Sequence, residues 1–198
     1  DSVATEVDAA VRMSTMFNHS ATHLLHAALR DALGDHVQQK GSLVDENRTR
    51  FDFSHPKPIT PAQLVEIESA VNTSIRGNAN VQARVMGYDQ AIDTGAVSLF
   101  GEKYGDEVRV IEMGEFSTEL CGGTHVKRTG DIGLFKIITE SGIASGIRRI
   151  EATTGQAALD YIHRREKQFF DISSILKVAP DEAADRLNQM IDNVKRWA

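Results

Sequence analysis

The chain has 198 residues, of which 41% are hydrophobic and 25% are charged. These proportions are typical of a folded globular protein and exclude an intrinsically disordered chain. The net charge of −6 excludes a protein that binds nucleic acid through charge alone, so any contact with RNA has to be local.

Three features bear on where the chain works. The sequence has no apolar run long enough to span a membrane, and its start lacks the basic and then apolar pattern of a secretory signal. A single cysteine cannot form an internal disulfide, which favours a cytoplasmic location. The first residue is Asp1 rather than methionine, from which we expect a piece of a longer protein.

The first part of the chain is predicted to be helical and then to form a hairpin. Apolar residues recur at helical spacing from residue 3 to 33, which predicts two helices, or one helix with a break near Asn18. Gly34 follows the last apolar residue, where a left-handed C-cap belongs. Apolar residues flank a polar turn at 45–47, so residues 40–54 are predicted to form a β-hairpin.

The middle of the chain is predicted to be rich in strands. Thr60 as N-cap and Pro61 at the first helical position predict a helix that ends near Arg76. Alternation of apolar residues and intervening turn formers then predict the following segments. Strands are expected at residues 81–86, 108–113, 135–138 and 147–152, with a short helix at 89–95.

The end of the chain is predicted to be a helical tail. The pattern is helical from Gln156 onward, and apolar residues spaced among charges in 182–197 are typical of the first turns of a longer coiled coil. The sequence therefore predicts an α+β fold in which helices pack against a mostly antiparallel sheet, with a C-terminal helical tail. We expect a domain at 1–155 and the tail at 156–198.

Two pairs of zinc-ligand residues share the same spacing. His19 and His23 are four residues apart in a predicted helix, so both imidazoles lie on one face. Cys121 and His125 are also four apart and enclose two glycines, which let the loop fold tightly so that thiolate and imidazole converge. Because three imidazoles and a thiolate complete a tetrahedral shell, the sequence predicts one Zn²⁺ ion held by both pairs.

Plainer interpretations remain open. His19 and His23 taken alone are equally typical of packing or of an exposed helix face, and His26 is interpreted as structural. Four protein ligands favour a structural zinc site over a catalytic one, which usually keeps a position open. Ser20 stands where the metalloprotease helix signature has a glutamate, so peptide hydrolysis of that kind is not expected.

Taken together, the motifs resemble the editing domain of bacterial alanyl-tRNA synthetases and the related free-standing AlaX-type proteins. The resemblance runs from about Asn18 to Gly155. Threonyl-tRNA synthetases have a related domain with a proline where Thr124 stands here, which favours the alanyl class. The segments that carry the resemblance are Asn18–Leu29, Gln39–Val44, Arg50–Phe53, Glu119–His125 and Ser145–Glu151.

The resemblance implies hydrolysis of tRNA(Ala) mischarged with serine or glycine, at the ester of the tRNA 3′ end. An alanine pocket cannot exclude the smaller glycine and rejects serine weakly, so a second, hydrolytic sieve is needed. The aminoacylation core of such a synthetase, absent from this chain, would be a partner. Two alternatives remain open: a zinc-stapled RNA-binding module without catalysis, and an editing domain of the threonyl type.

Zinc has two possible roles in this reaction. It either lowers the pKa of a water that attacks the ester, or holds the α-amino group of the substrate while another water attacks. A complete set of four protein ligands favours the second role.

Three further residues are assigned candidate roles. Thr22 is the candidate to bond the serine hydroxyl, with a back-bonded helix threonine as the alternative. Gln39 matches a glutamine of the family's editing pocket and is expected to orient substrate or water. Asp52 either steadies a ligating imidazole or lies on a solvated strand face. Substrate contacts are also expected from Gly122 and Gly123, and RNA contacts from Lys40, Arg50, Arg148 and Arg149.

Overall fold

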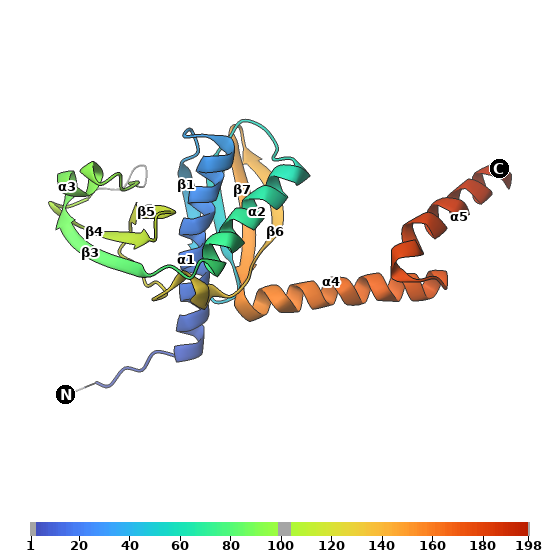
Figure 1. The fold of residues 1–198 in the computed structure, drawn as a ribbon, viewed down its shortest axis with the longest axis horizontal. Helices are drawn as coiled ribbons and strands as arrows, with labels where there is room; N and C mark the ends of the chain where they lie inside the picture. The colour runs from blue at the N-terminus through green and yellow to red at the C-terminus, as the bar shows by residue number, and fades with distance from the viewer. Residues whose placement is uncertain (1–2, 99–103, 198) are drawn as a thin grey trace. The chain divides into compact units, whose positions relative to one another are not determined.

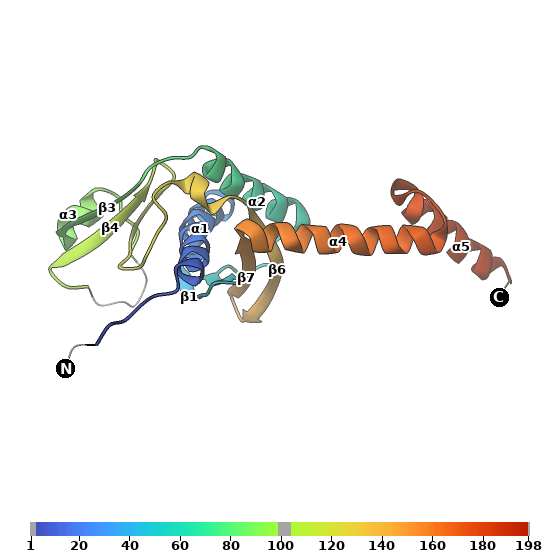
Figure 2. The same cartoon turned by 90° about the horizontal axis from the view of Figure 1, so that it is seen from below.

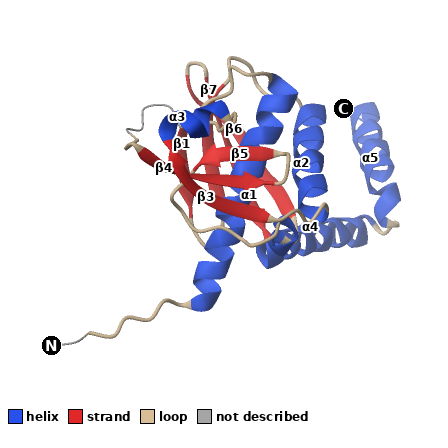
Figure 3. Ribbon diagram, turned by 60° about the vertical axis from the view of Figure 1, so that its left-hand side comes forward, coloured by secondary structure: helices blue, strands red, loops and turns tan. Residues whose placement is uncertain are grey.

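The structure is a computed structural model that describes residues 3–98 and 104–197. The chain divides into two compact units, Asp1–Ala158 and Leu159–Ala198. The described residues form helices and two antiparallel sheets, which confirms the α+β prediction (Figure 3).

Helix α1 (Ala9–Leu33) is continuous, so the predicted break near Asn18 is wrong. The side chain of Asn18 is buried and bonds to other elements: Nδ2 donates to the Asp45 carbonyl, and Oδ1 accepts from the Thr154 hydroxyl. The amide therefore does not compete with the helix backbone. The helix ends at Gly34, as predicted, with a positive φ of 112° that favours glycine, but its ψ of 169° is not that of a left-handed helical cap.

The larger sheet contains the predicted hairpin and has the strand order β1-β2-β7-β6. Phe51 and Phe53 point from its second strand into the main core, opposite to Arg50 and Asp52. Helix α2 (Pro61–Arg76) begins with the predicted Thr60 cap and packs against α1 and β6. The strands are β1 (Gln39–Val44), β2 (Thr49–Ser54), β6 (Phe135–Ala144) and β7 (Ile147–Thr154).

The structure has a second sheet, with the strand order β3-β4-β5, where the sequence led us to expect a single sheet. Strand β5 (Ser117–Leu120) was not predicted, because four residues are too few to show alternation. Helix α1 contacts β1, β2 and β7 of the larger sheet and β5 of the smaller one, and it lies between the two sheets (Figures 1 and 2). The remaining elements are β3 (Val81–Gly87), α3 (Tyr88–Asp93), β4 (Glu107–Met113) and the 3₁₀ helix η1 (Thr129–Ile132).

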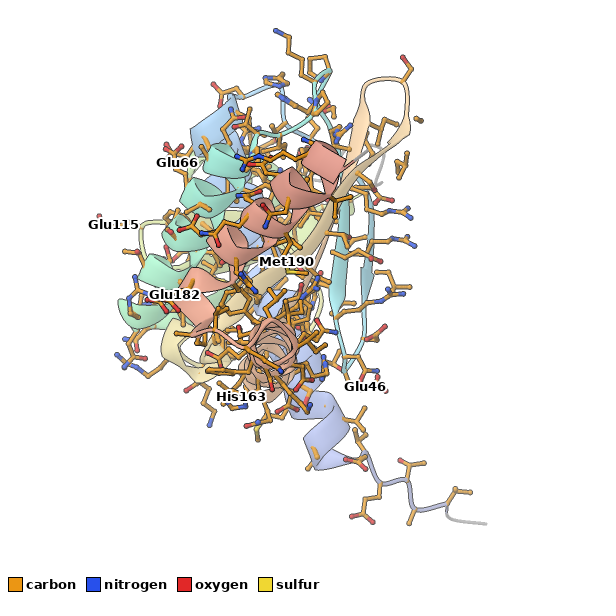
Figure 4. All side chains as sticks on the ribbon, turned by 90° about the vertical axis from the view of Figure 1, so that its right-hand side faces the viewer. Glu46, Glu66, Glu115, His163, Glu182 and Met190 are labelled. Carbon is orange, nitrogen blue, oxygen red and sulfur yellow. The ribbon has the colours of Figure 1, made fainter. Side chains whose placement is uncertain are left out.

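The second unit is helical, as expected for residues beyond Gln156. It contains most of α4 (Gly155–Leu176), the 3₁₀ helix η2 (Pro180–Glu182) and α5 (Ala183–Trp197). Glu182 and Met190, both labelled in Figure 4, line a groove at the turn from α4 into α5. Among the described helices, none combines the length and the apolar content needed to cross a bilayer.

Candidate metal centre

Four side chains from segments far apart in the sequence converge beside α1. One ligand atom from each of His19, His23, Cys121 and His125 lies within 4.8 Å of the other three. The Cys121 Sγ atom is 3.2 Å from His125 Nε2 and 3.5 Å from His19 Nε2. The two predicted pairs therefore meet, as a metal site requires.

The loop that carries Cys121 is held by strand β4. The Nη1 group of Arg109 donates to the carbonyl oxygens of Cys121 at 3.0 Å and of Gly123 at 2.6 Å. The Cys121 N–H in turn donates to the Arg109 carbonyl at 2.9 Å. Since β5 ends at Leu120 and contacts α1, these bonds fix the start of the loop next to the helix that carries the first pair.

The two glycines of the loop differ in their surroundings. A Cβ atom on Gly123 would lie 2.2 Å from Cε1 of His19, whereas one on Gly122 would have nothing within 4 Å. Only Gly123 is therefore required by the close approach of the loop to the ligand ring. Contact of either glycine with substrate stays a prediction.

Glu119 is a residue of the centre that the sequence analysis did not single out. Its Oε2 lies 2.6 Å from Nδ1 of His23, and its Oε1 lies 2.9 Å from Nδ1 of His26. All three side chains are buried. The sequence feature that could have indicated Glu119 is its position two residues before Cys121, within a segment that carries the family resemblance.

The interpretation of Asp52 as a carboxylate that steadies an imidazole is wrong, and so is the solvated alternative. Asp52 is buried, and its two carboxylate oxygens accept from Nε and Nη2 of Arg149 at 2.6 and 2.8 Å. It lies on the face of β2 opposite to Phe51 and Phe53, which pack toward α1.

Ser20 has a structural place in the centre. Its Oγ accepts from the Val126 N–H at 3.1 Å and lies 3.2 Å from Nδ1 of His125. With Nδ1 bonded there, the ring presents Nε2 toward Cys121. The residue that replaces the metalloprotease glutamate thus orients a ligand of the second pair.

The electrostatics of the cluster fit a zinc ion. Burial by itself would raise the pKa of the Cys121 thiol, but hydrogen bonds from His125 and His19, together with the nearby His23 ring, outweigh it and lower the pKa to about 3. Nε2 of His23 is buried and has no hydrogen-bond partner among the described residues. A thiolate and an imidazole nitrogen that points into the cluster are the donors that zinc uses, so these four residues would hold it.

We expect the thiolate to be observable in the metal-free protein. Because its pKa is about 3, the rate of Cys121 alkylation should stay nearly constant between about pH 5 and 8, where an ordinary thiol gains about tenfold per pH unit. The measurement is the pH profile of iodoacetamide labelling after chelation. A rise that tracks an ordinary thiol across that range would contradict the charged cluster.

The structure places the two other pocket candidates outside the four-residue cluster. The Thr22 hydroxyl is buried, donates to the Asn18 carbonyl at 2.8 Å and lies 2.6 Å from the Thr49 hydroxyl. This is the back-bonded arrangement that was left open. Gln39 begins β1, is half-buried, and lines a cavity of about 350 Å³ together with His26.

The four candidate RNA contacts are not on one surface. Arg50 and Arg149 lie on the face of the larger sheet that points away from the core, on either side of Asp52. Arg148, one residue along β7, is turned to the other face and forms an ion pair with Glu140. Lys40 is exposed on the edge strand β1, where its Nζ donates to Gln38.

The chain matches known proteins in two ways. Residues 108–151 match the model of the threonyl and alanyl tRNA synthetase second additional domain. The chain is 56% identical to an alanine–tRNA ligase of Nitrosomonas eutropha over 99% of its length, and 57% identical to those of Nitrosospira multiformis and Acidithiobacillus ferridurans over 98% and 99%. It covers 23%, 22% and 22% of these three relatives, so it spans less than a quarter of their length.

The matched domain covers nearly all of β4, the whole of β5, the Cys121–His125 loop, the whole of β6 and the first part of β7. The relatives match over nearly the whole chain, including the helix that carries His19 and His23. The resemblance to the editing domain of the alanyl-tRNA synthetases is thereby confirmed: the chain is homologous to one segment of these enzymes and contains the second additional domain that alanyl and threonyl enzymes share.

Proposed function

We propose that this chain is a zinc-dependent deacylase that hydrolyses the aminoacyl ester of tRNA(Ala) mischarged with serine or glycine. The observation that carries the proposal is the convergence of His19, His23, Cys121 and His125 within 4.8 Å in a segment homologous to alanine–tRNA ligases. A site of this kind meets a physical need, because binding alone separates substrates that differ by one small group only roughly 10- to 200-fold.

Zinc and the residues around its four ligands would have different roles at the site. Zinc, when bound there, supplies positive charge that either acidifies a water or holds the substrate α-amino group. Glu119 and Ser20 hold two of the ligand rings, and Arg109 holds the Cys121 loop. Four protein donors fill a tetrahedral shell, so either role would require zinc to accept a fifth ligand; we propose that this ligand would be the substrate α-amino group, with a separate water as the nucleophile. Gln39, which lines a cavity together with His26, is our candidate to orient that water or the substrate.

The test is a comparison of two substrates under two conditions. The chain is incubated with Ser-tRNA(Ala) and with Ala-tRNA(Ala), each with and without a zinc chelator, and the loss of esterified amino acid is followed. We expect rapid loss of serine only, and its abolition by chelation. Zinc binding without any deacylation would instead support a zinc-stapled RNA-binding module, and preferential hydrolysis of Ser-tRNA(Thr) would support a threonyl-type domain.

Thr22 is our candidate for the group that separates serine from alanine. Its hydroxyl uses its hydrogen toward Asn18 and retains an acceptor lone pair. Thr22→Val should lower the rate constant for Ser-tRNA(Ala) about tenfold, the equivalent of one hydrogen bond, and change that for Ala-tRNA(Ala) much less. Thr49→Val, which removes the neighbouring hydroxyl, is the control. Equal losses on both substrates would show that Thr22 acts only through the helix.

The basic residues singled out in the sequence are our candidates to hold the tRNA. We propose that Lys40, Arg50, Arg148 and Arg149 contact its phosphates, with Arg50 and Arg149 as a pair on the open sheet face. We also propose that residues 1–155 are the editing domain, that 156–198 are a tail which starts a coiled coil, and that the aminoacylation core of the same cytoplasmic synthetase supplies the mischarged substrate. The chain's own division after Ala158 supports this boundary.

A further inference from the structure

Glu119 is the only carboxylate in the described structure seen to bond two imidazoles, and just one of those imidazoles belongs to the metal cluster. Its Oε2 lies 2.6 Å from Nδ1 of His23, and its Oε1 lies 2.9 Å from Nδ1 of His26. The carboxylate side chain is 5% exposed, and the two imidazole side chains are 8% and 3% exposed. Because the three side chains are buried, each of these hydrogen bonds is electrostatically stronger than it would be in water.

The two contacts place a hydrogen on Nδ1 of both rings. A buried carboxylate only accepts hydrogen bonds, so each Nδ1 facing it has to carry a hydrogen. A neutral His23 ring with its hydrogen on Nδ1 has a lone pair on Nε2, which is the nitrogen that is buried without a partner. Glu119 therefore prepares His23 to bind a metal ion through Nε2.

The arrangement of His26 shows what this second imidazole does. Glu119 is its sole hydrogen-bond partner seen among the described residues, and its Nε2 is likewise buried and unpartnered. The ring packs against Phe51, with ring centroids 5.3 Å apart, so the main core fixes its position. Nδ1 of His26 therefore holds Oε1 of Glu119 in place.

We propose that Glu119 is a positioning residue for the metal centre and that His26, anchored in the core, holds Glu119 so that His23 presents Nε2 to the metal. This inference rests on the metal site of the proposed function and adds two residues that bind neither metal nor substrate. Loss of an outer carboxylate of this kind typically weakens metal binding about 10- to 100-fold.

Substitution of Glu119 tests the carboxylate itself. An amide has only one acceptor oxygen, so Glu119→Gln can receive one Nδ1–H and must donate to the other ring. We expect zinc affinity, measured by competition with a chromophoric chelator, to fall about 10- to 100-fold. In addition, ¹⁵N NMR should show one of His23 and His26 moving its hydrogen from Nδ1 to Nε2. Glu115→Gln, in the exposed turn before β5 (Figure 4), is the matched control and should change neither.

Substitution of His26 tests the anchor. His26→Leu should lower zinc affinity about tenfold, whereas His26→Asn, whose amide nitrogen takes the place of Nδ1, should restore most of it. Unchanged affinity and unchanged ¹⁵N signals in Glu119→Gln would overturn the inference, as would equal affinities of the two His26 variants. Wild-type protein that binds no zinc would contradict the proposed function instead, and the ¹⁵N signal of His26 would still report whether Nδ1 faces Glu119 with a hydrogen.

Discussion

Replacing Cys121 with alanine should remove both zinc binding and deacylation. The thiolate is the single anionic donor of the cluster and lies 3.2 Å from His125 Nε2 and 3.5 Å from His19 Nε2. If four ligands share a binding free energy of about 10–16 kcal/mol, loss of one costs about 3 kcal/mol, or more than 100-fold in affinity. Deacylation of Ser-tRNA(Ala) should fall at least as far at limiting zinc.

The measurement combines zinc content, zinc affinity and the rate of serine release on the same preparation. Cys121→Ser is a useful companion, since it keeps the size of the side chain but supplies a hydroxyl, a poor zinc ligand at neutral pH. Circular dichroism checks that both variants stay folded, as expected because Cys121 lies at the edge of the main core. Normal turnover of Ser-tRNA(Ala) by the alanine variant would remove the metal from the mechanism.

Replacing Gly123 with alanine should disrupt the centre without touching any ligand. The added methyl carbon would lie 2.2 Å from Cε1 and 2.7 Å from Nδ1 of His19, well inside contact distance. Either the ring or the loop has to move, and the loop is held by Arg109 through the Gly123 carbonyl. We expect the ring of His19 to leave its place, with a loss of about 100-fold in zinc affinity, as for a lost ligand.

The chain offers a matched control one residue away. A Cβ on Gly122 meets nothing within 4 Å, and neither glycine is among those with a positive φ. Gly122→Ala should therefore keep zinc affinity within about twofold of wild type, since an exposed change of this size costs less than ~0.5 kcal/mol. Zinc affinities that fall equally in the two variants would show that loop flexibility matters and that the approach to His19 does not.

Much of the fold was accessible from local patterns. The hairpin was predicted from apolar residues on both sides of a polar turn, and α2 was predicted from Thr60 as N-cap with Pro61 as the next residue. These features depend on neighbours a few residues apart, so the sequence displays them directly. The predicted break near Asn18 was wrong because the side-chain amide of Asn18 hydrogen-bonds to Asp45 and Thr154, which lie 27 and 136 positions further along the chain. No local sequence pattern shows such distant partners.

The second sheet was missed for a related reason. Strand β5 has only four residues, and its pairing with β4 is what makes it a strand. Short strands draw their stability from cross-strand neighbours and burial, not from their own propensity. The separation into two sheets on either side of α1 is likewise a property of packing (Figure 1).

At the metal centre, sequence by itself determined the donors: two pairs with equal spacing, of residue types that zinc prefers. Only the tertiary structure decided that the pairs meet, that Glu119 rather than Asp52 holds His23, and that Gly123 rather than Gly122 must lack a side chain. The physical reason is that ligand identity is a local property of the chain. Orientation and clearance depend on contacts between segments about 100 residues apart, and these exist only once α1 and the β5 loop have packed together.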